Sequence, residues 1–289
     1  MNKFSLKILK KLRVLPYLNL KGSIILNQTR FTIPIIQNTG YDNMFMSEPW
    51  MVALMKVILK NENKCFIDVG VNIGQTLLKL KSVSDKIKYI GFEPNPLCIF
   101  YVKNLIKENN FTDCHLIPVG LSDSTGIGVL NFFSDSTTDS SASIISDFRP
   151  NLKIVRKEYV SLFQVDQIKE QIGFNEFSIL KIDVEGAELE VIKSFLSLIE
   201  QNKPIILIEI LPAYDETNTD RIERQNEIVR IVTAIDYSIY RVIKQNDKFL
   251  HLKEIFNIEL HSDMNLCEYV MIPSDKKDKI KSHDPMIIT

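Results

Sequence analysis

Four residues in the first third of the chain, Asp68, Gly70, Asn72 and Gly74, have types and a spacing that suit the binding of a small molecule. They lie at the end of an apolar run and precede a segment with the periodicity of a helix. A buried parallel strand that breaks into a glycine-rich turn presents backbone N–H groups and the positive end of the following helix dipole above the sheet edge. The run therefore predicts a ligand site at this turn.

The residue types in this turn narrow the class of ligand. A dinucleotide fingerprint has glycine at three positions of G-x-G-x-x-G, whereas Asn72 stands at the second position here and Asp68 precedes the first. The carboxylate of Asp68 would repel a pyrophosphate and attract a cation or an amino group. S-adenosylmethionine (SAM) carries a sulfonium and an α-amino group, so the turn favours SAM over a dinucleotide.

Glu93 ends the next predicted strand, 89–93, and lies 25 residues after Asp68. An acid at this place can accept hydrogen bonds from both ribose hydroxyls of a nucleoside. The plainer interpretation is an acid that caps the following helix. The combination of turn and acid at the spacing of a strand–helix–strand unit favours the cofactor.

Two further acids, Asp183 and Glu209, lie at the ends of the apolar runs 177–183 and 204–210. Ligands of open α/β sheets bind outside the carboxyl ends of the strands, so we expect both carboxylates at the ligand site. A hydroxyl that accepts a methyl group needs a base or a metal ion to remove its proton. We expect either that Asp183 is this base, with a pKa raised by partial burial, or that both acids share a Mg²⁺ that binds a diol of the acceptor.

Plain structural roles compete with these interpretations. Asp183 would instead cap the helix that begins at Ala187, and we expect Glu185 and Glu188 to stabilise the first turn of that helix. Lys181 lies between apolar neighbours on a predicted buried strand. This position indicates either an ion-paired lysine near the site or a side chain that reaches solvent along the apolar surface.

The elements that must position these residues alternate along the chain. Apolar strands that alternate with helices predict a parallel sheet covered on both faces. We expect strands at 65–69, 88–93, 114–119, 177–183 and 204–210, helices at 73–82, 95–109, 187–201 and 221–235, and two last strands at 238–244 and 267–272.

Three parts of the chain are expected from these patterns. Residues 1–60 form an extension with a basic helix, short strands and a lid helix from 47 to about 60, residues 61–273 form the main domain, and residues 274–289 form a charged, disordered tail. Within the main domain, eleven of the fourteen residues 134–147 are Ser, Thr or Asp. Such a segment is either a lid over a binding site or a plain surface loop.

Composition excludes some classes of partner. A net charge of −1 and a pI near 6.5 argue against a nucleic-acid partner, which would need a basic face. The four cysteines have no C-x-x-C spacing, and the chain has neither a secretion signal nor an apolar run long enough to cross a bilayer. We therefore expect a cytoplasmic protein with reduced cysteines.

Four motifs in order closely resemble those of FkbM-type methyltransferases: 65–74, 91–96, 119–123 and 180–188. The resemblance implies an α/β fold with the Rossmann-like, seven-stranded and mostly parallel sheet of a class I SAM-dependent methyltransferase. It implies that the first motif contacts the methionine end of SAM, that Glu93 holds the ribose and that residues 120–122 border the adenine. The implied cofactor-binding residues are Asp68, Gly70, Asn72, Gly74, Glu93, Pro94, Gly120 and Leu121, and Asp183 and Glu209 are the catalytic candidates.

The resemblance implies O-methylation of a hydroxyl on a sugar or glycan, a glycolipid precursor or a secondary metabolite. One alternative is a catalytically inactive module with the same fold that binds a glycan or a membrane. Another is a nicotinamide-dependent dehydrogenase, against which Asp68 and Asn72 argue.

The first 41 residues contain no acid and seven bases. Phe4, Ile8, Leu9, Leu12 and Leu15 recur at helical spacing, so residues 3–15 predict a basic amphipathic helix. This helix either packs on its own domain or contacts an anionic membrane surface, which would make the protein peripheral at the inner face of the membrane.

Overall fold

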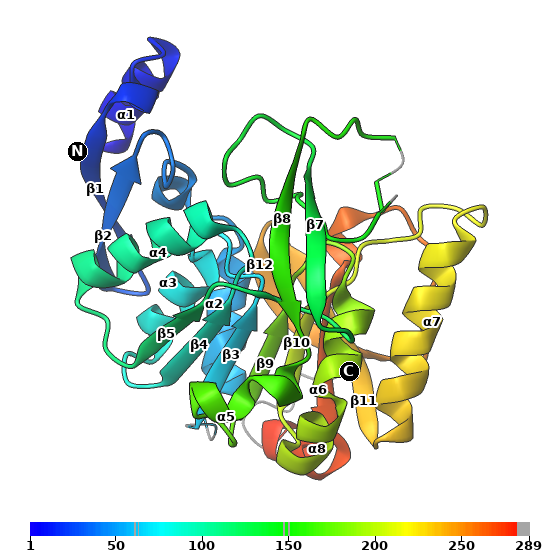
Figure 1. Cartoon of the computed structure of the whole chain (residues 1–289). Coiled ribbons are helices and arrows are strands. Elements are labelled where there is room, and N and C mark those ends of the chain that lie inside the picture. The colour runs from blue at the N-terminus through cyan, green and yellow to red at the C-terminus, as the bar shows by residue number, and fades with distance from the viewer. Residues whose placement is uncertain (61, 63, 147, 150, 282–289) are drawn as a thin grey trace.

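The computed structural model describes residues 1–60, 62, 64–146, 148–149 and 151–281, and its largest element is a sheet of eight strands (Figure 1). In spatial order the strands are β12 (Lys248–Ile255), β11 (Tyr237–Gln245), β13 (Glu268–Pro273), β10 (Ile205–Glu209), β9 (Ile179–Ile182), β3 (Cys65–Val69), β4 (Lys88–Phe92) and β5 (Cys114–Ile117). The strands from β10 to β5 are mutually parallel, whereas β13 and β12 run antiparallel to their neighbours. The predicted α/β fold with a mostly parallel sheet is confirmed.

Helices cover both faces of this sheet. On one face α2 (Pro49–Ile58), α3 (Gln75–Val83) and α4 (Pro96–Asn109) share an apolar core with Phe66 and Tyr89. On the other face α6 (Glu188–Asn202), α7 (Thr219–Ala234) and the short α5 (Lys169–Ile172) pack around Ile67 and Ile90. Successive residues of one strand therefore enter different cores, which explains why these strands are apolar almost throughout.

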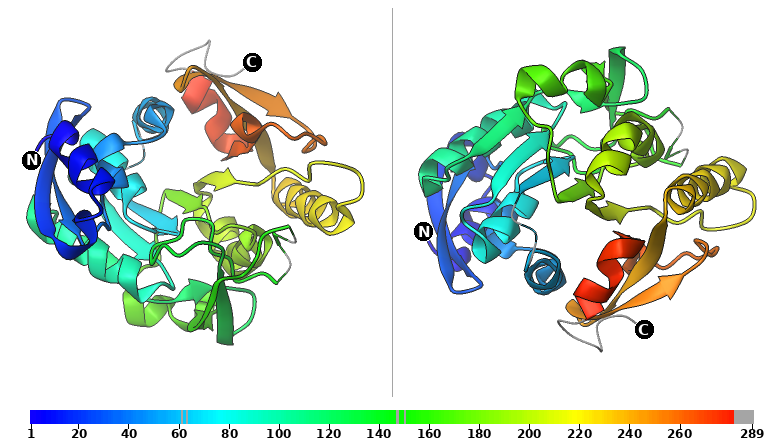
Figure 2. Two further views of the ribbon diagram at one scale, coloured as in Figure 1. Left: turned by 90° about the horizontal axis from the view of Figure 1, so that it is seen from above. Right: turned by 90° about the horizontal axis from the view of Figure 1, so that it is seen from below.

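A three-stranded sheet flanks the large one. It consists of β6 (Gly120–Leu121), β8 (Arg156–Phe163) and β7 (Gly126–Phe132) in that spatial order. The long segment between β7 and β8 contains the predicted polar loop and extends from the sheet toward the same end of the molecule as α1 (Lys3–Lys11) (Figures 1 and 2).

The N-terminal extension packs against α4. After α1 and the short helix η1 (Leu15–Tyr17), the hairpin of β1 (Asn19–Leu26) and β2 (Thr29–Ile36) leads through η2 (Asp42–Phe45) to α2. The side chain of Asn109 at the end of α4 bonds both the N–H and the carbonyl of Thr32, each at 2.7 Å. The predicted lid helix is α2, whose residues Trp50 and Leu54 are buried in the core.

Two expectations differ from the structure. The large sheet has one strand more than expected in the described residues, because Lys248–Ile255 pairs with β11 as an edge strand. Its alternating charged and apolar residues suit an edge.

The predicted disorder of the tail is wrong for 274–281, which form α8 (Ser274–Lys281). This helix is held by a 2.7 Å ion pair between Lys277 and Glu254 and by buried Ile280. Residues 282–289 lie outside the described residues.

Two observations bear on the expected compartment. The four cysteines are free thiols, and Cys65, Cys98 and Cys267 are buried. Among the described residues, no helix is both long and apolar enough to cross a membrane. The cytoplasmic location stays a prediction.

Candidate active site

The chain reverses its direction across the sheet between β3 and β9. It proceeds outward from β3 through β4 to β5 and then returns to β9 on the other side of β3. Open α/β sheets bind ligands at such a point, outside the carboxyl ends of the strands. A cavity of about 1000 Å³ opens there, and the segments after β3, β4 and β9 line it together with Glu209 at the end of β10 and residues 134–140.

The structure brings most of the predicted site residues to this cavity. Asp68 and Gly74 are the exceptions, since neither lines it. The predicted residues that do line it are Gly70, Asn72, Glu93, Pro94, Gly120, Leu121, Asp183 and Glu209.

Two glycines shape the turn after β3. Gly70 has a φ of +89°, and a Cβ there would lie 1.7 Å from the backbone oxygen of Asp183. The chain after β3 therefore passes against the chain after β9 with no room for a side chain. Gly74, with a φ of +76°, precedes α3, and a Cβ there would crowd Leu105 and Val102 of α4. Gly74 thus fixes the start of α3 behind the cavity wall.

Glu93 connects the turns that follow β3 and β4. One carboxylate oxygen accepts a hydrogen bond from the N–H of Asn72 at 2.8 Å, and the other accepts from the N–H of Asn95 at 2.8 Å. Burial raises the pKa of Glu93 to about 7, although the two backbone donors oppose this shift. Glu93 therefore holds the shape of the cavity where β3 and β4 end.

Asp68 is fully buried below the cavity. It accepts a 2.7 Å hydrogen bond from the hydroxyl of Tyr89, and Lys181 places its Nζ 3.3 Å from the carboxylate. Asp68 and Lys181 are direct register partners on the neighbouring strands β3 and β9. The structure therefore gives Asp68 a protein cation as its partner, where the sequence suggested the cation of a ligand.

Asp183 and Glu209 lie at the carboxyl ends of β9 and β10, and both face the cavity. Burial raises the pKa of Glu209, and the negative charge of Asp183 raises it further. For Asp183 the sign is opposite, because the Lys181 ammonium at 3.1 Å and a hydrogen bond with Glu209 more than offset burial and lower its pKa. The expected rise in the pKa of Asp183 is thus wrong. At neutral pH, Glu209 holds the proton of the pair and Asp183 is ionised.

The donor set around these acids does not suit a divalent cation. The Lys181 ammonium lies 3.1 Å from the Asp183 carboxylate, where it would repel a bound divalent cation. Within the described ranges no group of three or more His, Cys, Asp or Glu residues has the geometry of a metal site. The structure therefore gives the predicted Mg²⁺ no support.

The order of the motifs along this cavity matches a known family. The model of the methyltransferase FkbM domain matches residues 68–241, which is more than half of the chain. The chain belongs to the FkbM methyltransferase family. Membership of this family argues against the nicotinamide-dependent dehydrogenase alternative.

Other similarities of this FkbM methyltransferase are more distant. The methyltransferase sdnD of Sordaria araneosa is 28% identical over 157 residues, which are 45% of this chain and 60% of that protein. The crystal structure of methyltransferase FkbM from Methylobacillus flagellatus KT aligns with a TM-score of 0.44 and 16% identity, over 73% of this chain and 43% of that one. An O-methyltransferase from Bacillus cereus in complex with S-adenosylhomocysteine (SAH) aligns with a TM-score of 0.43 and 10% identity, over 76% of this chain and 77% of that one. The chain thus spans less than two thirds of the first two relatives.

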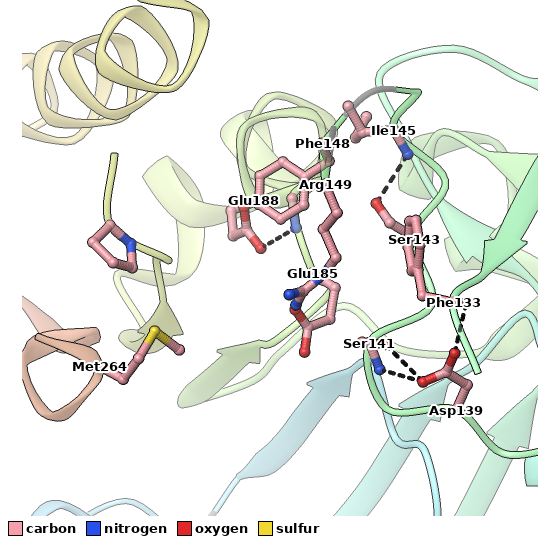
Figure 3. A network of polar contacts seen from close by, with 12 residues as sticks. Phe133, Asp139, Ser141, Ser143, Ile145, Phe148, Arg149, Glu185, Glu188 and Met264 are labelled. Atoms are coloured by element: carbon pink, nitrogen blue, oxygen red, sulfur yellow. Dashed lines mark hydrogen bonds and ion pairs between the residues drawn. The ribbon is translucent and has the colours of Figure 1, made fainter. Parts of the chain in front are cut away.

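The polar loop is folded around Asp139 (Figure 3). The Asp139 carboxylate accepts hydrogen bonds from the N–H groups of Phe133, Ser134 and Ser141 and from the Ser141 hydroxyl, at 2.7–3.1 Å. Asn95 donates to the carbonyl of Thr137 at 2.9 Å, which connects the loop to the turn after β4. Because 134–140 line the cavity, this part of the loop borders the ligand site, while Asp147 lies outside the described residues.

Replacing Asp139 with alanine is expected to loosen this loop. Backbone amides that lose a carboxylate acceptor should exchange with solvent about tenfold faster, since the bonds contribute ~1–1.5 kcal/mol. Burial alone would raise the pKa of Asp139, but its hydrogen bonds outweigh burial and lower it. The protection of these amides should therefore be complete above the ordinary aspartate pKa. It should be lost as the pH falls through the lowered pKa of the folded state. Hydrogen exchange at Phe133 and Ser134 measures both effects.

The matched control for this loop is Asp135→Ala, because Asp135 is an exposed acid of the same segment. Its exchange rates should stay within about twofold of the unchanged protein. Equal exchange in the Asp139 and Asp135 variants would contradict the role of Asp139.

Arg149 was missed at the sequence level. It forms an ion pair with Glu185, which has a φ of +54° and lies beside the cavity, and Figure 3 shows the two side chains together. Glu188 begins α6 and accepts a 2.8 Å hydrogen bond from the N–H of Gly186, which agrees with its expected role at the helix start. No motif marks Arg149, because its partner lies 36 residues away.

Proposed function

We propose that this chain uses SAM to methylate a hydroxyl group on a sugar or glycan, a glycolipid precursor or a secondary metabolite. The proposal is supported by one cavity that combines the glycine-rich turn and Glu93 with the pair Asp183 and Glu209. Membership of the FkbM family supports methyl transfer as the reaction.

The charges around the cavity favour a cationic cofactor. Acids greatly outnumber bases among the lining residues, and Lys181 is the single base among them in the described part of the chain. Such a field attracts a sulfonium and repels a pyrophosphate. Apart from Glu209, which holds a proton, the lining acids are Asp42, Glu48, Glu93, Asp135, Asp139, Asp183 and Glu185.

The residues after β3 and β4 would hold the cofactor, which supplies a methyl group bonded to a cationic sulfur. Gly70 lets the turn after β3 pass directly against Asp183, because a Cβ there would meet the Asp183 carbonyl oxygen, and this turn lines the cavity. Glu93 faces the cavity from the end of β4, where an acid can bind ribose hydroxyls. These features fit an adenosyl cofactor.

Asp183 has the properties of the base. Lys181 keeps its carboxylate ionised, and its side chain is 37% exposed toward the cavity. With SAM bound, the acceptor oxygen would form a bond with the methyl carbon as the carbon–sulfur bond breaks, and Asp183 would take the hydroxyl proton. Glu209 carries the proton of the pair and donates it in a hydrogen bond to the Asp183 carboxylate, which stabilises the negative charge there.

Two measurements test the proposal. Calorimetric titrations with SAM, with its demethylated product S-adenosylhomocysteine and with NAD should give binding for the first two only. Incubation with methyl-labelled SAM and a panel of sugar nucleotides, lipid-linked sugars and polyketides, with and without a chelator, should label one acceptor class. The absence of heat and thermal shift with SAM would refute cofactor binding, and binding without label in any acceptor would favour the inactive module.

Glu93→Gln is expected to weaken SAM binding by roughly 5- to 150-fold. Glutamine keeps the shape of the side chain but has one oxygen where glutamate has two. Its amide nitrogen is a donor, so the backbone N–H that faces it, of Asn72 or of Asn95, loses its acceptor. An unsatisfied buried donor costs ~1–3 kcal/mol. Calorimetry measures the change. Glu108→Gln on α4, which removes an acid paired with Lys21 far from the cavity lining, should leave the affinity unchanged.

A further inference from the structure

Helix α1 has an apolar stripe that nothing in the described chain covers. Phe4, Ile8 and Leu12 follow one another at intervals of about one helical turn, and they are 72%, 43% and 64% exposed. The other side of the helix is anchored, because Leu6 is fully buried in the core. A helix that packs only on its own domain turns its apolar stripe inward. The outward stripe therefore indicates a partner.

The surface around this stripe is strongly basic. The chain has a net charge of only −1, yet its first acidic residue is Asp42, so positive charge is concentrated at this end. Within the described residues, none of the cations in and directly after α1 forms an ion pair, and three lysines lie over aromatic rings instead. These cations are Lys3, Lys7, Lys10, Lys11 and Arg13.

The stripe lies close to the cavity. Pro16, in η1 directly after α1, is a lining residue of the cavity, and its neighbour Tyr17 is 84% exposed. Figures 1 and 2 show α1 at the same end of the molecule as the loop that contains residues 134–140. A partner that binds α1 would therefore lie beside the opening of the cavity.

We propose that α1 and η1 dock on the anionic surface of a lipid bilayer. Phe4, Ile8 and Leu12 enter the headgroup region, and the lysines nearest the stripe, Lys7 and Lys11, bind the anionic headgroups beside it. Large apolar side chains flanked by cations are the pattern by which interfacial helices bind such surfaces. A second copy of the chain fits the stripe poorly, because two copies would bring two sets of five cations together. Docking brings the edge of the cavity at Pro16 to the membrane surface.

Sedimentation with lipid vesicles tests this proposal on the full chain. Binding is expected to phosphatidylcholine vesicles that contain about 30% phosphatidylserine and not to phosphatidylcholine alone. High salt should weaken the binding, because it screens the charges. Lys7→Gln with Lys11→Gln should lower the affinity about 25-fold, at roughly fivefold per lysine. Phe4→Ser, Ile8→Ser and Leu12→Ser together should abolish sedimentation with the vesicles.

Matched control variants lie on other elements. Ile127→Ser with Phe256→Ser removes apolar side chains that are 72% and 89% exposed, and Lys248→Gln with Lys253→Gln removes two exposed lysines of β12. Both should bind vesicles within about twofold of the unchanged protein. All replaced side chains are exposed, so every variant should have the melting temperature of the unchanged protein. If a multiple variant melts at a lower temperature, its substitutions are measured one at a time.

Three results would overturn membrane docking. They are equal binding to neutral and anionic vesicles, unchanged binding of the stripe variant, and a stripe variant that converts a dimer to a monomer on gel filtration. The last result would assign the stripe to a second copy of the chain. None of these results depends on SAM, so failure here is distinct from failure of the proposed methyl transfer.

Discussion

Lys181→Met is expected to lower the free energy of unfolding by ~3–5 kcal/mol at neutral pH. Lys181 is 4% exposed and lies between Asp68, at 3.3 Å, and Asp183, at 3.1 Å. Methionine fills a similar volume, but it leaves the fully buried carboxylate of Asp68 without its counterion. Urea denaturation followed by circular dichroism measures the change.

The pH dependence of this variant has a definite sign. Burial already raises the pKa of Asp68, and Lys181 partly offsets that rise. Without Lys181 the folded-state pKa rises further above the unfolded value. A group with a raised folded-state pKa stabilises the fold below its unfolded pKa and loses this contribution as the pH rises through the folded-state value. The deficit of the variant should therefore shrink as the pH falls from neutral toward the ordinary aspartate pKa.

Two controls separate the lost ion pair from lost packing. Adding Asp68→Asn to Lys181→Met should restore much of the stability, because no buried charge then remains unpaired. Lys88→Met, on the neighbouring strand β4 where the lysine is partly exposed, should cost less than about 1 kcal/mol. If the double variant is no more stable than Lys181→Met alone, the charge of Asp68 is not the cause.

Asp183→Asn is expected to reduce methyl transfer about 10²- to 10⁴-fold and to leave SAM affinity within a few-fold. Asparagine keeps the shape of the side chain but cannot take the hydroxyl proton. The fold should persist, because Lys181 keeps Asp68 as its partner and the backbone of Asp183 still donates to Val69 at 3.0 Å. Single-turnover transfer from methyl-labelled SAM measures the rate, and calorimetry measures the affinity.

The control for this variant is Asp123→Asn. Asp123 is an exposed acid that does not line the cavity, and its replacement should leave the rate within about twofold. Full activity of the Asp183 variant would remove Asp183 as the base. A parallel loss of SAM binding would assign it to the cofactor instead.

Where the signal was local, the sequence predicted residues that the fold brings to one cavity. The glycine-rich turn, the acid at position 93 and the acids at 183 and 209 all follow apolar runs, and parallel strands bring their carboxyl ends to one edge. The edge strand β12 was missed, because its charged and apolar residues alternate outside any matched motif. Helix α8 (Ser274–Lys281) was missed because its polar composition suits a disordered tail as well as a helix.

The chain's own residue types and spacing determined the fold class, the edge of the sheet that holds the cavity and the acids at that edge. The tertiary structure decided which charges meet. Strand register places Lys181 opposite Asp68, across 113 positions of the chain. Lys181 lowers the pKa of Asp183, and burial together with the charge of Asp183 raises the pKa of Glu209. Apolar periodicity reports burial, whereas the pKa of a buried acid depends on neighbours that only the register and packing of the strands bring within a few ångströms.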